Sequence, residues 1–169
     1  MKKTLCSIAA ILCVGLLFSS CKKEVIHDGG DSQALTSLYT IEPSDWVSEG
    51  NGVFHNDNNG LDELTEDITD QGAVLIFIAD NATDANALIY SGSSKFGVWD
   101  NEGEFFYDFT SDATDGSVRI LAVGNTSSAP RPDFPLYIKV VSIPSSLIAQ
   151  HPNVNTKDYN EVRRVFNLR

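Results

Sequence analysis

Short segments of alternating apolar and polar residues, separated by turn residues, fill most of the chain. In residues 104–110 (EFFYDFT), Phe105, Tyr107 and Phe109 lie on one face of an extended strand, and residues 136–143 (LYIKVVSI) alternate in the same way. Turn residues recur between such segments about every 8–12 residues. This pattern predicts antiparallel strands that each bury one face.

Two segments depart from this alternation. Residues 73–79 (AVLIFIA) are apolar throughout, which is typical of a strand buried on both faces or of a short buried helix. The turn residues on either side favour the strand. Residues 61–72 (LDELTEDITDQG) carry Leu61, Leu64 and Ile68 at helical spacing, which predicts one or two acidic helical turns.

The chain ends in a segment with the pattern of a short amphipathic helix. Asn155 is a suitable N-cap, and Tyr159 and Val162 follow at helical spacing. Together with the strands, this helix predicts an all-β fold over residues 37–169. We expect an antiparallel two-sheet β-sandwich with a short C-terminal helix.

The first 20 residues have the pattern of a bacterial signal peptide. Lys2 and Lys3 precede an apolar run over residues 5–18, and Ser19-Ser20 then lead to Cys21. The run holds about 14 residues, fewer than the ~20 that a membrane-spanning helix needs. LFSSC resembles the lipobox of bacterial lipoproteins, in which the cysteine is acylated and becomes the mature N-terminus.

Several phrases further along the chain are similar to a group of small Bacteroidetes-type lipoproteins. They are SDWV, LTEDITDQGAVLIFIAD, YIKVVSIP and DYNEVRRVFNL. The resemblance implies a β-sandwich after a lipidated Cys21 and a place on the outer membrane, at its periplasmic face or at the cell surface. It implies no catalytic residue.

Composition agrees with an anchor that consists of lipid alone. Removal of the signal peptide takes away Lys2 and Lys3 and lowers the formal charge from −11 to −13, so the mature chain repels nucleic acid and anionic headgroups. Cys21 is then the one remaining cysteine, which excludes an internal disulfide. Residues 21–36 are polar and without periodicity, and they predict a flexible tether.

An acidic segment is the nearest approach to a metal site. In residues 55–66 (HNDNNGLDELTE), Asp57, Asn59 and Glu66 match positions 3, 5 and 12 of an EF-hand loop. The first position holds a histidine where a hard cation needs an aspartate, and no helix precedes the loop. A looser calcium site among acidic loops is an alternative, and solvated loops are the simplest interpretation.

Aromatic residues suggest a second kind of site. Trp46 and Trp99 are the two tryptophans, and an exposed flat platform of such rings would stack on sugars. Most aromatic side chains of a sandwich belong to its core, but Trp99 stands directly before a turn and should be partly exposed. We therefore name Trp46 and Trp99 as candidate ligand-binding residues.

Catalytic patterns are lacking. The three histidines have no metal-binding spacing, no GxSxG occurs, and no glycine-rich phosphate loop is present. We expect a binding or structural module of the cell envelope, without cofactor, and not an enzyme. Its partner would be a glycan or another envelope protein. A carbohydrate-binding surface lipoprotein is the alternative, and a calcium-stabilised module or a hydrolase is less favoured.

Overall fold

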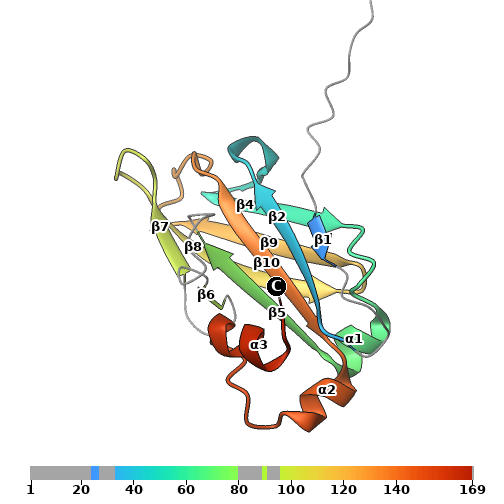
Figure 1. The fold of residues 1–169 in the computed structure, drawn as a ribbon. Helices are drawn as coiled ribbons and strands as arrows, with labels where there is room; N and C mark the ends of the chain where they lie inside the picture. Colours follow the sequence, from blue (N-terminus) through green and yellow to red (C-terminus); the bar gives the residue numbers. More distant parts are fainter. Residues whose placement is uncertain (1–23, 27–32, 80–88, 91–95, 169) are drawn as a thin grey trace, which may run out of the picture.

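A computed structural model describes residues 24–26, 33–79, 89–90 and 96–168. The strands form two five-stranded antiparallel sheets that pack face to face (Figure 1). Sheet A consists, in spatial order, of β1 (Glu24–Ile26), β2 (Leu35–Ile41), β10 (Leu136–Ile143), β5 (Ala73–Ala79) and β6 (Ile89–Tyr90). Sheet B consists of β3 (Val47–Gly50), β4 (Val53–Asn59), β9 (Ser117–Gly124), β8 (Phe106–Thr114) and β7 (Phe96–Trp99). The predicted all-β sandwich is confirmed.

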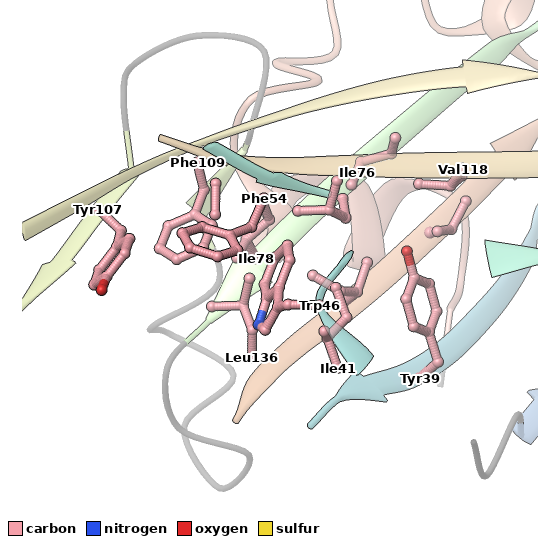
Figure 2. Packing of buried hydrophobic residues seen from close by; sticks show 14 of the residues in the cluster. Tyr39, Ile41, Trp46, Phe54, Ile76, Ile78, Tyr107, Phe109, Val118 and Leu136 are labelled. Carbon is pink, nitrogen blue, oxygen red and sulfur yellow. The ribbon is translucent and has the colours of Figure 1, made fainter. Parts of the chain in front are cut away.

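The inner faces of the two sheets enclose the main core. Alternate residues of the strands point inward, as the sequence pattern predicts, so Tyr107 and Phe109 of β8 are fully buried. Trp46 lies between the sheets, 5.9 Å from the Phe109 ring and beside Ile78 and Leu136 (Figure 2). These large side chains supply most of the apolar area that the sandwich removes from water.

A second core covers the outer face of sheet A. Helix α2 (Ser145–Gln150) follows β10, and α3 (Tyr159–Val165) packs across the sheet (Figure 1). Tyr159 contacts Phe77 edge to face at 5.2 Å. Because β5 faces the main core on one side and these helices on the other, its sequence is apolar throughout.

The helices differ in detail from the sequence prediction. Helix α3 begins after Asp158, whose side chain accepts hydrogen bonds from two backbone N–H groups of its first turn, and not after Asn155. The predicted acidic turns after β4 are shorter than expected and form α1 (Glu66–Gln71). The sequence did not predict α2, nor the 3-10 turn η1 (Pro43–Asp45) between β2 and β3.

The polar run after Val53 does not end its strand. β4 continues to Asn59 and pairs with β9 along its whole length, as far as Asn59 opposite Ser117. Similarly, the turn-forming residues 48–52 (SEGNG) continue β3 as far as Gly50, and the chain reverses at Asn51 and Gly52, both at positive φ. Backbone pairing with a neighbour therefore overrides the low strand propensity of asparagine.

Part of the predicted tether belongs to sheet A. Glu24–Ile26 form the edge strand β1, in which Glu24 pairs with Leu38 and Ile26 with Thr36, and β2 begins at Leu35. A tether over residues 21–36 is therefore wrong for these stretches. Two apolar β-branched residues and free backbone groups at the β2 edge suffice for a short strand, although composition alone suggests a spacer.

Candidate functional site

The outer face of sheet B is the accessible face of the sandwich. Its outward residues are exposed or half-buried, whereas α2 and α3 bury the corresponding face of sheet A. Within the described residues, the large hydrophobic side chains that are exposed are Val47, Trp99 and Val123, and strand alternation places all three on this face. Val47 lies opposite His55, apart from Trp99. Exposed apolar groups on an accessible face can mark an interaction site. We call this face the open face.

One end of the open face is apolar. Trp99 is 55% exposed and lies beside Phe106, its cross-strand partner, with ring centroids 5.3 Å apart and ring planes tilted by 59°. The Phe106 ring covers Gly97, where a Cβ would overlap it. Val123 pairs with Val53 on the neighbouring strand. Phe106 therefore supports the indole ring of Trp99 from one side while its other side faces solvent.

The other end of the open face is charged. Arg119 donates two hydrogen bonds to the carboxylate of Asp57, from Nε at 2.6 Å and from Nη2 at 3.0 Å. These bonds hold the pKa of Asp57 below its ordinary value. His55 lies between two carboxylates, with Nδ1 2.9 Å from Glu49 Oε1 and Nε2 3.7 Å from Asp57 Oδ2. The result is a strip of polar side chains in which Asp57 and Arg119 form an ion pair.

The structure does not form the predicted metal site. The EF-hand-like interpretation of Asp57, Asn59 and Glu66 is wrong, because Asp57 and Asn59 belong to a paired strand and Glu66 opens α1. The carboxylate of Asp57 binds Arg119, whose positive charge repels a cation. Across the described residues, no group of three or more histidine, cysteine, aspartate or glutamate side chains is arranged to hold a metal ion.

The two candidate tryptophans have opposite environments. Trp46 is only 2% exposed and fills the main core, so its proposed role in ligand binding is wrong. The predicted exposure of Trp99 is confirmed. The pattern of residues 43–47 did not reveal the difference, because η1 turns the chain inward at Trp46. Cys21, the predicted lipid attachment site, lies outside the described residues.

Sequence reasoning missed several polar contacts. The buried hydroxyl of Ser37 donates to the carboxylate of Glu63, which is also buried. On the open face, the alternation of His55, Asp57 and Asn59 was a detectable signal for a shared face. Their partner Arg119 could not be found, because it is 62 positions away from Asp57 in the chain.

A buried tyrosine joins sheet B to the segment between β9 and β10. The Tyr107 hydroxyl donates a 2.7 Å hydrogen bond to the carbonyl oxygen of Pro130. Burial, with smaller contributions from the carboxylates of Asp100 and Asp133, raises the pKa of Tyr107 to about 12. The phenol therefore stays protonated and can keep donating.

Two shallow hollows lie beside α3. A depression of about 430 Å³ is lined by Arg163, Arg164 and their neighbours on α3, and one of about 280 Å³ lies between α3 and the segment after α2. Both are open and distant in sequence from the open face. Neither brings together groups that would form a catalytic centre.

Comparison with other proteins suggests no functional site, so the open face is the candidate that the structure itself provides. No family model, no curated protein and no solved structure is significantly similar to this chain. Within the described ranges, no helix has the length and apolarity needed to cross a bilayer.

Proposed function

We propose that this chain is a lipid-anchored binding module of the bacterial envelope, which holds its partner on the open face of sheet B. The observation that supports a binding role is the difference between the two sheets. The chain covers the outer face of sheet A with its own helices and leaves three large apolar side chains on sheet B accessible to solvent. An exposed indole ring beside the half-buried Phe106 is a surface that a partner could cover.

The anchor rests on the signal peptide and on LFSSC. Cys21 would carry the acyl chains, and more than one chain is needed for stable membrane attachment. The Cys21→Ala variant should lose incorporation of labelled fatty acid and move from the membrane to the soluble fraction. Cys13→Ala, a change inside the signal peptide, is the matched control and should leave both unchanged. Retention of Cys21→Ala in the membrane fraction would disprove the anchor.

The binding role is tested with the soluble Cys21→Ala protein. Immobilised on a column, it should retain an envelope component that a Val123→Glu variant does not retain. Val123 is an exposed residue, so the new charge disrupts the apolar end of the open face and leaves the fold intact. Ser146→Glu, on α2, is the control and should retain the component like the parent protein.

Carbohydrate binding is the second candidate. Trp99 favours it, because an exposed indole ring can stack on the apolar face of a sugar. The platform is limited to one ring, since Phe106 is tilted by 59° and Trp46 is buried. Titration with neutral oligosaccharides should change the fluorescence of the parent protein and not of Trp99→Phe. An unchanged signal over all neutral sugars tested would remove this candidate.

A further inference from the structure

We propose that the larger hollow beside α3 binds a phosphate monoester, that is, the phosphate group of a small organic molecule. We call this site the α3 hollow. Two guanidinium groups, two amides and one apolar side chain line it, from Arg163, Arg164, Asn160, Asn167 and Leu168. It lies with α3 on the outer side of sheet A (Figure 1). The site is separate from the open face, so it adds a binding activity that does not depend on the proposed function.

The helical period brings the polar lining residues together. Asn160, Arg163 and Arg164 are three and four residues apart, which places them on one face of α3. Asn167 lines the hollow just after the last turn of the helix. The buried residues of α3 lie on another face, which packs against sheet A. Packing on the sheet therefore directs the two arginines toward solvent, where both are exposed.

The end of the helix restrains Arg163. Asn167 has a positive φ of 54°, so the chain turns back and the Leu168 N–H donates to the Arg163 carbonyl oxygen at 2.9 Å. The Nε of Arg163 in turn donates a long hydrogen bond of 3.4 Å to the Leu168 carbonyl oxygen. Among the described residues, none accepts a hydrogen bond from its two Nη groups. These groups are therefore available to a ligand.

The positive charge of the two arginines is not offset by a neighbouring carboxylate. The acidic residues of the first turn bind elsewhere, since Asp158 accepts from backbone N–H groups of α3 and Glu161 Oε1 accepts from the Asn155 N–H at 3.3 Å. Within the described ranges, neither Arg163 nor Arg164 forms an ion pair. The C-terminal end of a helix carries only about half a negative charge, less than the positive charge of two guanidinium groups. The α3 hollow therefore attracts an anion.

The number of donors favours a phosphate group over a carboxylate. A single guanidinium group satisfies a carboxylate with two parallel N–H···O bonds. Two guanidinium groups and two amides can donate to the three terminal oxygens of a phosphate monoester, whose charge of about −1.5 to −2 matches that of the arginines. The volume of about 430 Å³ lies in the range of small-molecule sites and leaves room for the organic part beside Leu168.

The charge of the whole chain favours a soluble ester over a lipid headgroup. The formal net charge is −11, so a bilayer surface that carries many phosphate groups would meet repulsion from the acidic domain. A small ester brings one phosphate group to the basic hollow, and salt screens the more distant carboxylates beyond about 8 Å. We therefore expect a soluble phosphate monoester as the ligand.

The test is an NMR titration of the soluble Cys21→Ala protein with glycerol 3-phosphate. The side-chain amide signals of Asn160 and Asn167 should shift and reach saturation. Arg164→Gln should weaken the affinity about tenfold, the loss expected for a charge-assisted hydrogen bond. Arg164→Lys should restore only part of it, because an ammonium group keeps the charge and lacks the fork of donors. Arg131→Gln, an exposed change of equal charge outside the hollow, is the matched control and should bind like the parent.

Three results would overturn the site. The first is the absence of saturable shifts, and the second is an affinity that Arg164→Gln leaves unchanged. The third is equal weakening by Arg131→Gln, because the attraction would then come from net charge alone. Acetate at the same ionic strength should bind more weakly than glycerol 3-phosphate. If it binds as tightly, the ligand is a carboxylate and the phosphate assignment is wrong.

Vesicles that contain phosphatidic acid distinguish the two sources of a phosphate monoester. The Cys21→Ala protein should not float with them. If it floats, if Arg164→Gln does not, and if glycerol 3-phosphate gives no shifts, the ligand is a lipid headgroup and the soluble-ester assignment is wrong. None of these results affects the binding role of the open face, which the Val123→Glu variant tests separately.

Discussion

The outer faces of the two sheets differ: helices cover the outer face of sheet A, and the outer face of sheet B is accessible to solvent. On sheet A, Phe77 and Ile143 are completely buried beneath α2 and α3. On sheet B, the outer face keeps Trp99 and Val123 accessible beside paired charges. Both sheets have five strands and share one core, so neither architecture nor size explains the difference.

The comparison shows how one fold can bury the outer face of one sheet and leave that of the other accessible. Burying both faces of sheet A provides a second cluster of apolar contacts, which stabilises the domain. The residues that the structure describes contain no cysteine, so this stabilisation comes from packing. Sheet B contributes to the core with one face only. Its other face can therefore change or hold a partner at little cost in stability.

Substitution of one phenylalanine on each sheet tests this contrast most strongly. Phe77→Ala removes a fully buried ring from beneath α3 and should lower the free energy of unfolding by about 3–5 kcal/mol. Phe106→Ala, on the open face, is the matched control and should cost less than half as much, because that ring is only half-buried. Urea unfolding of the soluble Cys21→Ala protein measures both. Equal losses would contradict the contrast.

The helix that covers sheet A depends on its N-cap. Asp158 accepts hydrogen bonds from the backbone N–H groups of Asn160 at 2.9 Å and Glu161 at 3.3 Å. Asp158→Ala should lower the free energy of unfolding by about 1 kcal/mol. Asp115→Ala, an exposed change in the turn between β8 and β9, is the control. A cap variant as stable as the parent in urea would show that packing alone holds α3 in place.

A single hydroxyl on the inner side of sheet B should have a measurable effect. Tyr107→Phe removes the bond to the Pro130 carbonyl and should cost about 1 kcal/mol. The pKa of Tyr107 is raised to about 12, while an unfolded tyrosine ionises near ~10. The unfolded chain thus loses its proton first, and the stability from this group, fully present below pH ~10, is lost as pH rises toward ~12.

Alkaline unfolding curves check that prediction. The parent protein should lose stability more steeply between pH ~10 and ~12 than Tyr107→Phe does. Tyr137→Phe, which leaves the bond to Pro130 in place, should behave like the parent. Parallel curves for the parent and Tyr107→Phe would contradict the burial of a protonated phenol.

The smallest effect is expected at the charged end of the open face. The hydrogen bonds from Arg119 lower the pKa of Asp57, so the pair stabilises the protein at neutral pH and loses this effect as pH falls below the ordinary value near ~3.8. Asp57→Asn should abolish that acid dependence. The change should be slight and should shrink with added salt, because exposed ion pairs are screened.

Acid unfolding of Asp57→Asn and of Asp62→Asn provides the comparison. Asp62 is exposed and serves as the control. A large, salt-independent loss in Asp57→Asn would mean that the open face contributes to stability as strongly as the covered face. That result would contradict the division of roles between the sheets.

Local pattern accounts for much of what was predicted correctly. Alternation in residues 104–110 predicted which side of β8 is buried, and the uniform apolarity of residues 73–79 predicted a strand covered on both faces. The exposure of Trp99 followed from the turn after it. In each case the decisive information lies within a few residues, since strand periodicity is a property of neighbouring positions.

The sequence predictions failed where a contact with a distant segment of the chain determines the local structure. β1 and the polar half of β4 are strands because β2 and β9 offer them backbone hydrogen bonds, whatever their own propensity. Asp57 has the composition of a metal ligand, yet its register opposite Arg119 makes it half of an ion pair. No window of the sequence contains both members of these contacts.

Chain composition and short-range periodicity by themselves determined the fold class, the signal-peptide pattern before Cys21 and the net negative charge of this protein. Only the tertiary structure decided which tryptophan is buried, which sheet the helices cover and how closely sheet A follows Cys21. The physical reason is that burial and strand pairing are relations between segments far apart in the chain. Their free energy is realised only when those segments meet.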